Sequence, residues 1–150
     1  MRDVKYIVLH CTATPQNTTV DSIKKYWKNT LKWNNVGYHY VIEANGNIVQ
    51  LADESKVTNG VGGYNTYCIH ISYMGGIDSK GKAVDNRTEK QKEVMFTKVK
   101  ELLALYEGAE LVGHCDFPNV KKACPCFDAK EWFDKENIIG DLDPKTEKRV

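Results

Sequence analysis

Two histidines and one cysteine, far apart in the sequence, are the residues best suited to carry chemistry in this chain. His10 directly follows an apolar stretch, His114 follows a short apolar segment, and Cys124 precedes a proline. Such strand ends and turns are where a rigid scaffold presents side chains to a cleft. Two neutral imidazoles and one thiolate can hold zinc as three protein ligands. The fourth position then stays open to water, as hydrolytic zinc requires.

Spacing alone leaves other roles open for these residues. The chain has no compact metal motif of the Cys-x-x-Cys and His-x-x-x-His kind, and an isolated histidine is usually a packed or solvated residue. Cys126 is a rival to Cys124 as a ligand, and a cysteine hydrolase that pairs either thiol with a histidine is an alternative. Asp116, close to His114, either orients an imidazole or forms part of a turn, which is the commoner role of aspartate.

The hydrophobic pattern predicts strands that alternate with helices. An apolar, β-branched run predicts a buried strand at residues 4–9, and strand-like segments follow at residues 37–42, 47–51, 67–73 and 111–112. The Asn45-Gly46 pair is a strong hairpin signal between the second and third of these. Strands mixed with helices predict an α/β fold, with a single-domain mixed β-sheet flanked by helices.

Helix ends are marked by capping residues. Thr19 is expected to begin a helix that runs to about residue 31, and Asp128 to begin the last helix. Thr88 and Gln91 have the spacing of a capping box, and the helix that they open is expected to stop before Gly108. We expect the domain to span residues 1–140, followed by a charged tail at residues 141–150.

Composition describes an ordinary globular protein of one domain. The chain has 150 residues, 41% of them hydrophobic and 27% charged, with a net charge of +1. This balance favours neither a nucleic-acid partner nor a membrane-surface role, and we expect a monomer. No signal peptide is visible at the start of the sequence, so we expect synthesis in the cytoplasm and action on its target after release or export.

Five cysteines, an odd number, cannot all pair within one chain and fit a reducing compartment. Cys11 and Cys115 directly follow the two key histidines. Neighbouring side chains on an extended segment point to opposite faces. If His10 and His114 face a cleft, these two cysteines should face the core.

Several segments together resemble a known family, the zinc-dependent N-acetylmuramoyl-L-alanine amidases of type 2, whose fold is shared with peptidoglycan recognition proteins. The likeness is greatest to the short single-domain phage amidases that are traditionally called lysozymes. The matching segments occur in the family's order: Val8–Thr14, Val36–Tyr40, Gly63–Asn65, Gly75–Lys82, Gly113-His114 and Lys122–Asp128.

The resemblance implies roles for five residues. His10, His114 and Cys124 would bind Zn2+, and Tyr38 and Lys122 would be the catalytic helpers. It implies peptidoglycan or a muropeptide as substrate, and cleavage of the amide bond between N-acetylmuramic acid and L-alanine of the stem peptide. An ammonium group suits the stabilisation of a developing oxyanion, and a phenol can donate a hydrogen bond to it. Without the resemblance, Tyr38 would be interpreted as a packing residue and Lys122 as a solvated one.

Three further histidine-related positions complete the interpretation. His39 follows Tyr38, should point to the opposite face, and is expected to be structural. Family members often carry a histidine in the loop that here contains Gly60, and commonly have glycine where this chain has His70. Both differences lie near the expected substrate groove and bear on stem-peptide preference.

Other functions stay open at the level of sequence. A non-catalytic peptidoglycan-binding module of the same fold is the main alternative, and regulation of a partner protein is another. The biological setting could be a phage endolysin, an exported effector or a cytoplasmic recycling amidase.

Overall fold

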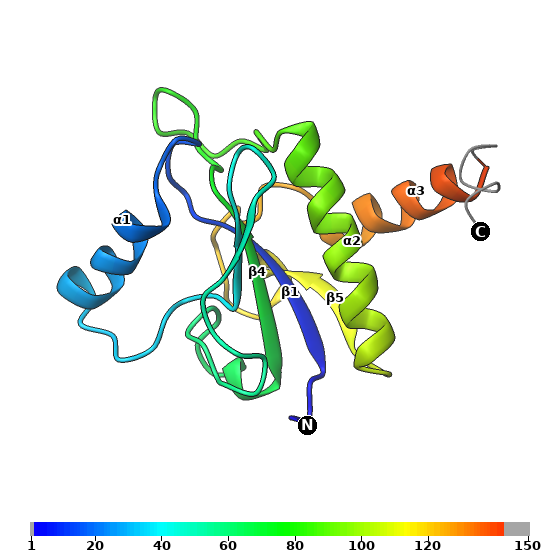
Figure 1. The fold of residues 1–150 in the computed structure, drawn as a ribbon, viewed down its shortest axis with the longest axis horizontal. Helices are drawn as coiled ribbons and strands as arrows, with labels where there is room; N and C mark the ends of the chain where they lie inside the picture. The colour runs from blue at the N-terminus through cyan, green and yellow to red at the C-terminus, as the bar shows by residue number, and fades with distance from the viewer. Residues whose placement is uncertain (1, 143–150) are drawn as a thin grey trace.

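A five-stranded mixed sheet with helices packed on it forms the centre of the computed structural model, which describes residues 2–142 (Figure 1). The regular elements, in chain order, are β1 (Tyr6–Cys11), α1 (Val20–Lys25), β2 (Tyr40–Ile42), β3 (Ile48–Gln50), β4 (Cys68–Tyr73), α2 (Glu89–Leu105), β5 (Glu110–Gly113) and α3 (Ala129–Leu142). Three single turns accompany them: η1 (Tyr26–Thr30), η2 (Asn65–Tyr67) and η3 (His114–Asp116).

The strand order in the sheet is β3-β2-β4-β1-β5. Neighbouring strands run parallel except for β3, which pairs antiparallel with β2 through the predicted hairpin. The register of β1 with β4 places Val8 beside His70 and His10 beside Ser72. Because paired residues of parallel strands share a face, these four side chains lie on one side of the sheet.

The two faces of the sheet have different coverings. One face carries the odd-numbered side chains of β1 and β4 and is packed by α2, through residues such as Ile7, Leu9, Ile69, Ile71, Met95, Val99 and Leu102. On the other face, α1 packs Ile23, and the turn η1 that continues it packs Trp27, against Val41 and Met74. Figure 1 shows α1 and α2 on either side of the central strands. Since α2 fills its own face with apolar contacts, the face that carries His10, His70 and Ser72 is the one that can hold a site.

The predicted helix starts are confirmed. The side chains of Thr19, Thr88 and Asp128 each accept a hydrogen bond from the backbone N–H three residues later, at 3.2, 3.1 and 3.0 Å. Gln91 completes the capping box because its side chain accepts from the backbone N–H of Thr88 at 2.9 Å. After α2, Gly108 adopts a φ of +83°, the left-handed conformation that favours glycine.

Element lengths differ from the predictions in a few places. The predicted strand at 37–42 is reduced to β2, because residues 37–38 leave the ladder although His39 still donates its backbone N–H to the carbonyl of His70. The predicted helix from residue 20 continues beyond α1 as a π-helical turn. The expected domain boundary at 140 falls within α3, and residues 143–150 of the predicted tail lie outside the described residues.

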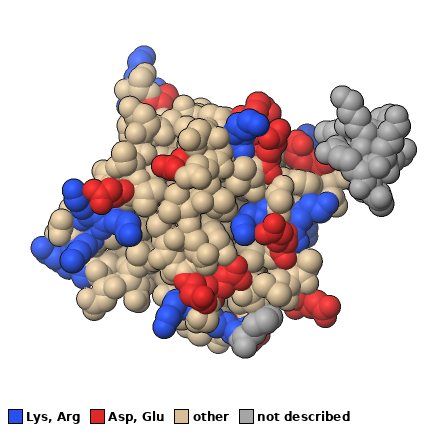
Figure 2. Space-filling model, in the orientation of Figure 1, with Lys and Arg blue, Asp and Glu red and all other residues tan. Residues whose placement is uncertain are grey.

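Charges of both signs are interspersed over the face in Figure 2. Lysines gather at the end formed by α1, where Lys24, Lys28 and Lys32 border a shallow hollow. Across residues 2–142, no helix combines the length and the apolar character needed to cross a bilayer.

Candidate metal and catalytic site

Three potential metal ligands meet at one edge of the sheet. His10 lies near the end of β1, and His114 comes directly after β5, which runs parallel to β1. The nitrogen and sulfur ligand atoms of His10, His114 and Cys124 all lie within 4.8 Å of one another. His10 Nδ1 is 3.8 Å from Cys124 Sγ. Ligand atoms around a tetrahedral zinc are separated by roughly 3.3–3.8 Å, so small side-chain movements complete the geometry.

The chemistry of this donor set fits zinc. Burial is the main cause that lowers the pKa of His10 well below its usual value, and burial also lowers the pKa of His114. Both imidazoles are therefore neutral at physiological pH, as metal binding requires. The backbone N–H of Cys11 points at Cys124 Sγ from 3.2 Å, and such a donor stabilises a thiolate. One thiolate and two neutral imidazoles are typical zinc ligands.

Cys124 lies in an irregular segment that is tied to the sheet by its neighbours. Its backbone oxygen accepts a hydrogen bond from the N–H of Cys115 at 2.9 Å. The hydroxyl of Tyr73, at the end of β4, donates to the carbonyl of Pro125 at 2.8 Å. A cysteine more than a hundred residues from His10 is thereby held beside it.

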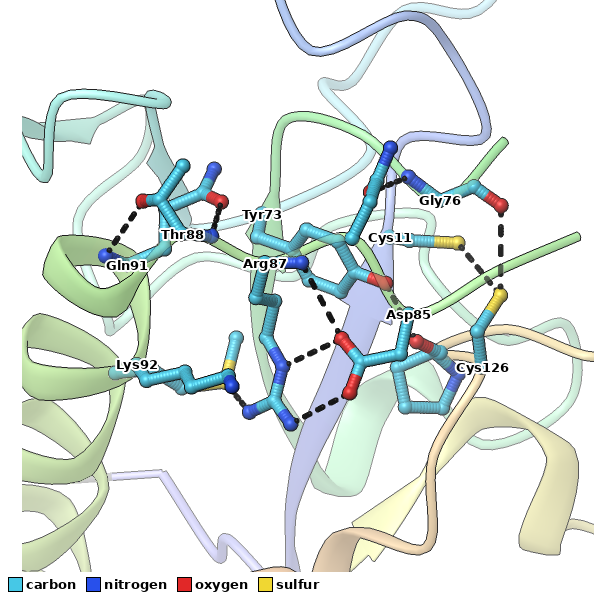
Figure 3. Close-up of polar contacts among 12 residues, drawn as sticks. Cys11, Tyr73, Gly76, Asp85, Arg87, Thr88, Gln91, Lys92 and Cys126 are labelled. Carbon is cyan, nitrogen blue, oxygen red and sulfur yellow. Dashed lines mark hydrogen bonds and ion pairs between the residues drawn. The ribbon is translucent and has the colours of Figure 1, made fainter. Parts of the chain in front are cut away.

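A buried arginine fixes the chain just after Cys124. The side chain of Arg87 is 2% exposed, and its guanidinium donates to both oxygens of Asp85, at 2.9 and 3.0 Å (Figure 3). The same group lies over the rings of Phe127 and Trp132, 3.4 and 4.5 Å from their centroids. Arg87 thus joins the loop before α2 to the segment that carries the thiol.

Replacing Arg87 by methionine is expected to lower the free energy of unfolding by about 3 kcal/mol. Arg87 is buried although Asp85 reaches the surface, so the loss comes from the charge-assisted hydrogen bonds of the guanidinium to that carboxylate and from its stacking on two rings. Urea unfolding followed by circular dichroism measures the change. Lys90→Met is the matched control, since Lys90 pairs with Glu93 on the exposed surface of α2. Equal losses in the two variants would contradict this assignment.

Tyr38 lies beside the ligand cluster. Its ring centroid is 5.0 Å from that of His10, and its hydroxyl donates to the carbonyl of Cys11 at 3.3 Å. Burial, followed by the charge of Cys124, raises the pKa of the phenol well above its ordinary range. The hydroxyl of Tyr38 therefore stays protonated and can act only as a neutral donor or acceptor.

Lys122 approaches the cluster from the solvent side. Its side chain is exposed, two residues before Cys124. After burial, its positive charge is a further cause that lowers the pKa of His10 and of His114. The ammonium group of Lys122 therefore lies close enough to both imidazoles for its charge to affect them.

The structure separates the two candidate thiols. Cys126 Sγ contacts Cys11 Sγ and the carbonyl oxygen of Gly76 (Figure 3), at 3.9 and 3.5 Å, and among the described residues it is Cys124 whose sulfur groups with His10 and His114. Asp116 takes the turn role, because its carboxylate accepts the backbone N–H of Gly113 at 2.8 Å. Within residues 2–142, Asp116 has no hydrogen bond to an imidazole.

One prediction about the cysteines is confirmed and one is wrong. Cys11 is buried in the core beneath α2, as alternation along β1 requires. Cys115 is only half-buried. The alternation argument fails there because the chain stops being extended after Gly113 and enters the single turn η3 at His114.

His70 is a residue whose role the sequence analysis missed. It was expected at the substrate groove, yet it is fully buried and its Nδ1 lies 2.8 Å from His10 Nε2. Alternation along each strand indicates that residues 8 and 10 share a face of one strand, and that residues 70 and 72 share a face of another. That these two pairs lie side by side depends on the register of β1 with β4, which the sequence does not provide.

A family model described as N-acetylmuramoyl-L-alanine amidase matches residues 1–127. The chain belongs to this family. The endolysin of Escherichia phage T7 is 38% identical over 135 residues, which are 89% of this chain and 87% of that protein. The amidase LysC from Clostridium intestinale superposes with a TM-score of 0.74 at 24% identity, covering 91% of this chain and 87% of LysC. PGRP-SA from Apis mellifera superposes with a TM-score of 0.69 at 18% identity, covering 89% and 83%.

These similarities confirm the predicted α/β class and the predicted family. The solved structures, at these identities, establish the fold, while the family match establishes the activity. The amidase is a peptidoglycan hydrolase, and His10, His114 and Cys124 form a group in it that could hold a metal ion.

Lower pH is expected to destabilise the metal-free amidase. Burial lowers the pKa of His10 and His70 well below the ordinary 6.5, and lowers that of His39 and His114 as well. Below about pH 6.5 the unfolded chain binds protons that the folded chain excludes, so the free energy of unfolding falls by up to about 1.4 kcal/mol per pH unit for each histidine. This stabilisation is fully present above pH 6.5 and is lost as the pH falls.

Urea titrations of the zinc-free chain between about pH 7 and pH 5.5 measure this effect, since carboxylates titrate mainly below that window. A free energy of unfolding that stays constant or rises on acidification would contradict the buried, neutral state of these imidazoles.

Proposed function

We propose that this amidase is zinc-dependent, with His10, His114 and Cys124 as the ligands of the ion and with Lys122 and Tyr38 as catalytic residues. The bond cleaved is the amide between the lactyl group of N-acetylmuramic acid and L-alanine of the stem peptide. The observation that carries this proposal is the convergence of two imidazoles and one thiol, with ligand atoms within 4.8 Å, from three distant parts of the chain.

Each residue has a separable task in this proposal. Zinc, when bound, supplies a Lewis acid that polarises the scissile carbonyl and lowers the pKa of water. Lys122 contributes a positive charge toward the carbonyl oxygen as negative charge develops there. Tyr38 holds a protonated hydroxyl beside the cluster, where it can donate a hydrogen bond to the same oxygen. Burial keeps His10 neutral and available as a ligand.

The intact donor set favours hydrolysis over the non-catalytic binding module that the same fold can form. Similarity to the phage T7 endolysin over most of both chains supports an endolysin that acts on the bacterial cell wall. We further propose a monomer whose partner is peptidoglycan or a muropeptide, without a nucleic-acid or membrane partner.

Metal analysis and product identification test this function together. The purified chain is expected to hold about one zinc ion. Digested peptidoglycan should release stem peptides that begin with a free L-alanine amine, and glycan strands whose muramic acid keeps its lactyl carboxylate, both identified by mass spectrometry. A chelator should stop the release and added zinc should restore it. Cleaved glycosidic bonds, or full activity in chelator, would overturn the proposal.

A further inference from the structure

A chain of hydrogen bonds extends from His10 through the buried His70 to Asn65 of the turn η2. His10 Nε2 lies 2.8 Å from His70 Nδ1, and His70 Nε2 lies 2.9 Å from Asn65 Oδ1. His10 is 1% exposed and His70 is fully buried. Both ring nitrogens of His70 are therefore engaged, and the bond between the two imidazoles is buried.

The donor and the acceptor in each of these hydrogen bonds follow from the end of the chain at Asn65. Asn65 Oδ1 also accepts the backbone N–H of Val61 at 2.7 Å, which identifies this atom as the amide oxygen. His70 must then carry its proton on Nε2, so its Nδ1 is a bare acceptor. That acceptor requires the proton of His10 to be on Nε2. The remaining nitrogen, His10 Nδ1, is bare and is the one 3.8 Å from Cys124 Sγ.

The surroundings of His70 are built to hold the ring in place. Its backbone N–H donates to His39 Nδ1 at 3.0 Å, and His39 Nε2 donates in turn to the carbonyl of Lys56 at 2.8 Å. Gly60 lies against the ring, and an added Cβ there would be 2.4 Å from His70 Nδ1. A residue larger than glycine at position 60 would therefore displace the imidazole.

We propose that His70 is a positioning residue of the amidase, which orients the ring of His10 and fixes its tautomer so that Nδ1 faces the metal position. The inference rests on the proposed zinc site and assigns a function to a residue outside it. Partners that bind the second nitrogen of a ligand histidine set its orientation and basicity, and their loss typically costs about 10–100-fold in metal affinity.

Two substitutions at position 70 separate positioning from packing. His70→Leu fills much of the volume but has no acceptor for His10 Nε2–H. His70→Asn is smaller, but its side-chain oxygen can take the place of Nδ1. We expect zinc affinity, measured by competition with a chelator, to fall about 10–100-fold in His70→Leu and to be largely recovered in His70→Asn. If His70 only fills space, the order reverses and leucine is the better replacement; that order would overturn the proposal.

Nitrogen NMR of the wild-type chain tests the same inference without any substitution. Protonated and bare ring nitrogens have distinct 15N shifts, read through their couplings to the ring protons. In the zinc-free and the zinc-loaded full chain, His70 should be protonated at Nε2 and bare at Nδ1. In the zinc-free chain, His10 should be held as the Nε2–H tautomer. A proton on His70 Nδ1 in either state overturns the proposal, even where a position-70 variant fails to fold.

Different results would contradict the proposed zinc site and the proposed role of His70. A wild-type chain that binds no zinc contradicts the proposed cofactor, whereas the tautomers of His10 and His70 in the zinc-free chain still test the hydrogen-bond chain. A wild-type chain that binds zinc, with unchanged affinity in His70→Leu, retains the proposed function and rejects the positioning role of His70.

Discussion

Replacing Cys124 by serine is expected to abolish both tight zinc binding and peptidoglycan hydrolysis. A serine hydroxyl is a poor zinc ligand at neutral pH, and the two imidazoles alone leave the ion weakly held. The loss should exceed the roughly 10–100-fold that changes around the ligands cause. Zinc content by mass spectrometry and release of stem peptides from purified cell walls measure the two effects on one preparation.

Cys126→Ser is the matched control for this substitution. Cys126 lies two residues away, is half-buried like Cys124, and has its sulfur beside Cys11 and Gly76. Zinc content and hydrolysis should both persist in Cys126→Ser. Loss of both functions in this variant, with Cys124→Ser active, would make Cys126 the ligand.

A second substitution distinguishes a ligand from a nucleophile. Cys124→Asp keeps an anionic zinc ligand but removes the thiol, so it should retain measurable zinc binding and some hydrolysis. An enzyme that used Cys124 as a covalent nucleophile would lose all activity in Cys124→Asp, and zinc would not restore it. That outcome would replace the zinc mechanism by a cysteine hydrolase.

Local signals predicted the helices of this fold better than the strands. Capping depends on residues a few positions apart, so Thr88 and Gln91 could be identified from the sequence. Strand limits depend on partners far away in the chain. Residues 37–38 have a strand-like composition but leave the ladder, where Gly37 lies against Trp27 and Tyr38 donates a hydrogen bond to the carbonyl of Cys11 at the end of β1.

The part of the candidate site that lies in family motifs could be predicted from the sequence. The part that depends on the register of the strands could not. The resemblance selected Cys124 over Cys126, and the structure brings Cys124 beside His10. His70 could not be placed, because its contact with His10 exists only through the pairing of β1 with β4. The error at Cys115 has a local origin instead, since alternation holds only as far as the backbone is extended.

Lys122→Ala is expected to lower kcat by about 10²–10³-fold while leaving zinc content unchanged. The charge of Lys122 lowers the pKa of His114, so its removal raises that pKa. Kinetics on a soluble muropeptide at about pH 8 avoid this side effect, because the imidazole stays neutral there.

The neighbouring Lys121 provides the control, since it is also exposed and carries the same charge. Lys121→Ala should leave kcat nearly unchanged, whereas Lys122→Arg should recover part of it, because a guanidinium keeps the positive charge but changes its shape and reach. Loss of zinc from Lys122→Ala would show that the lysine supports the metal site and not the reaction. An equal fall in both alanine variants would mean that the charge acts on substrate encounter, and that no single donor near Cys124 stabilises the carbonyl oxygen.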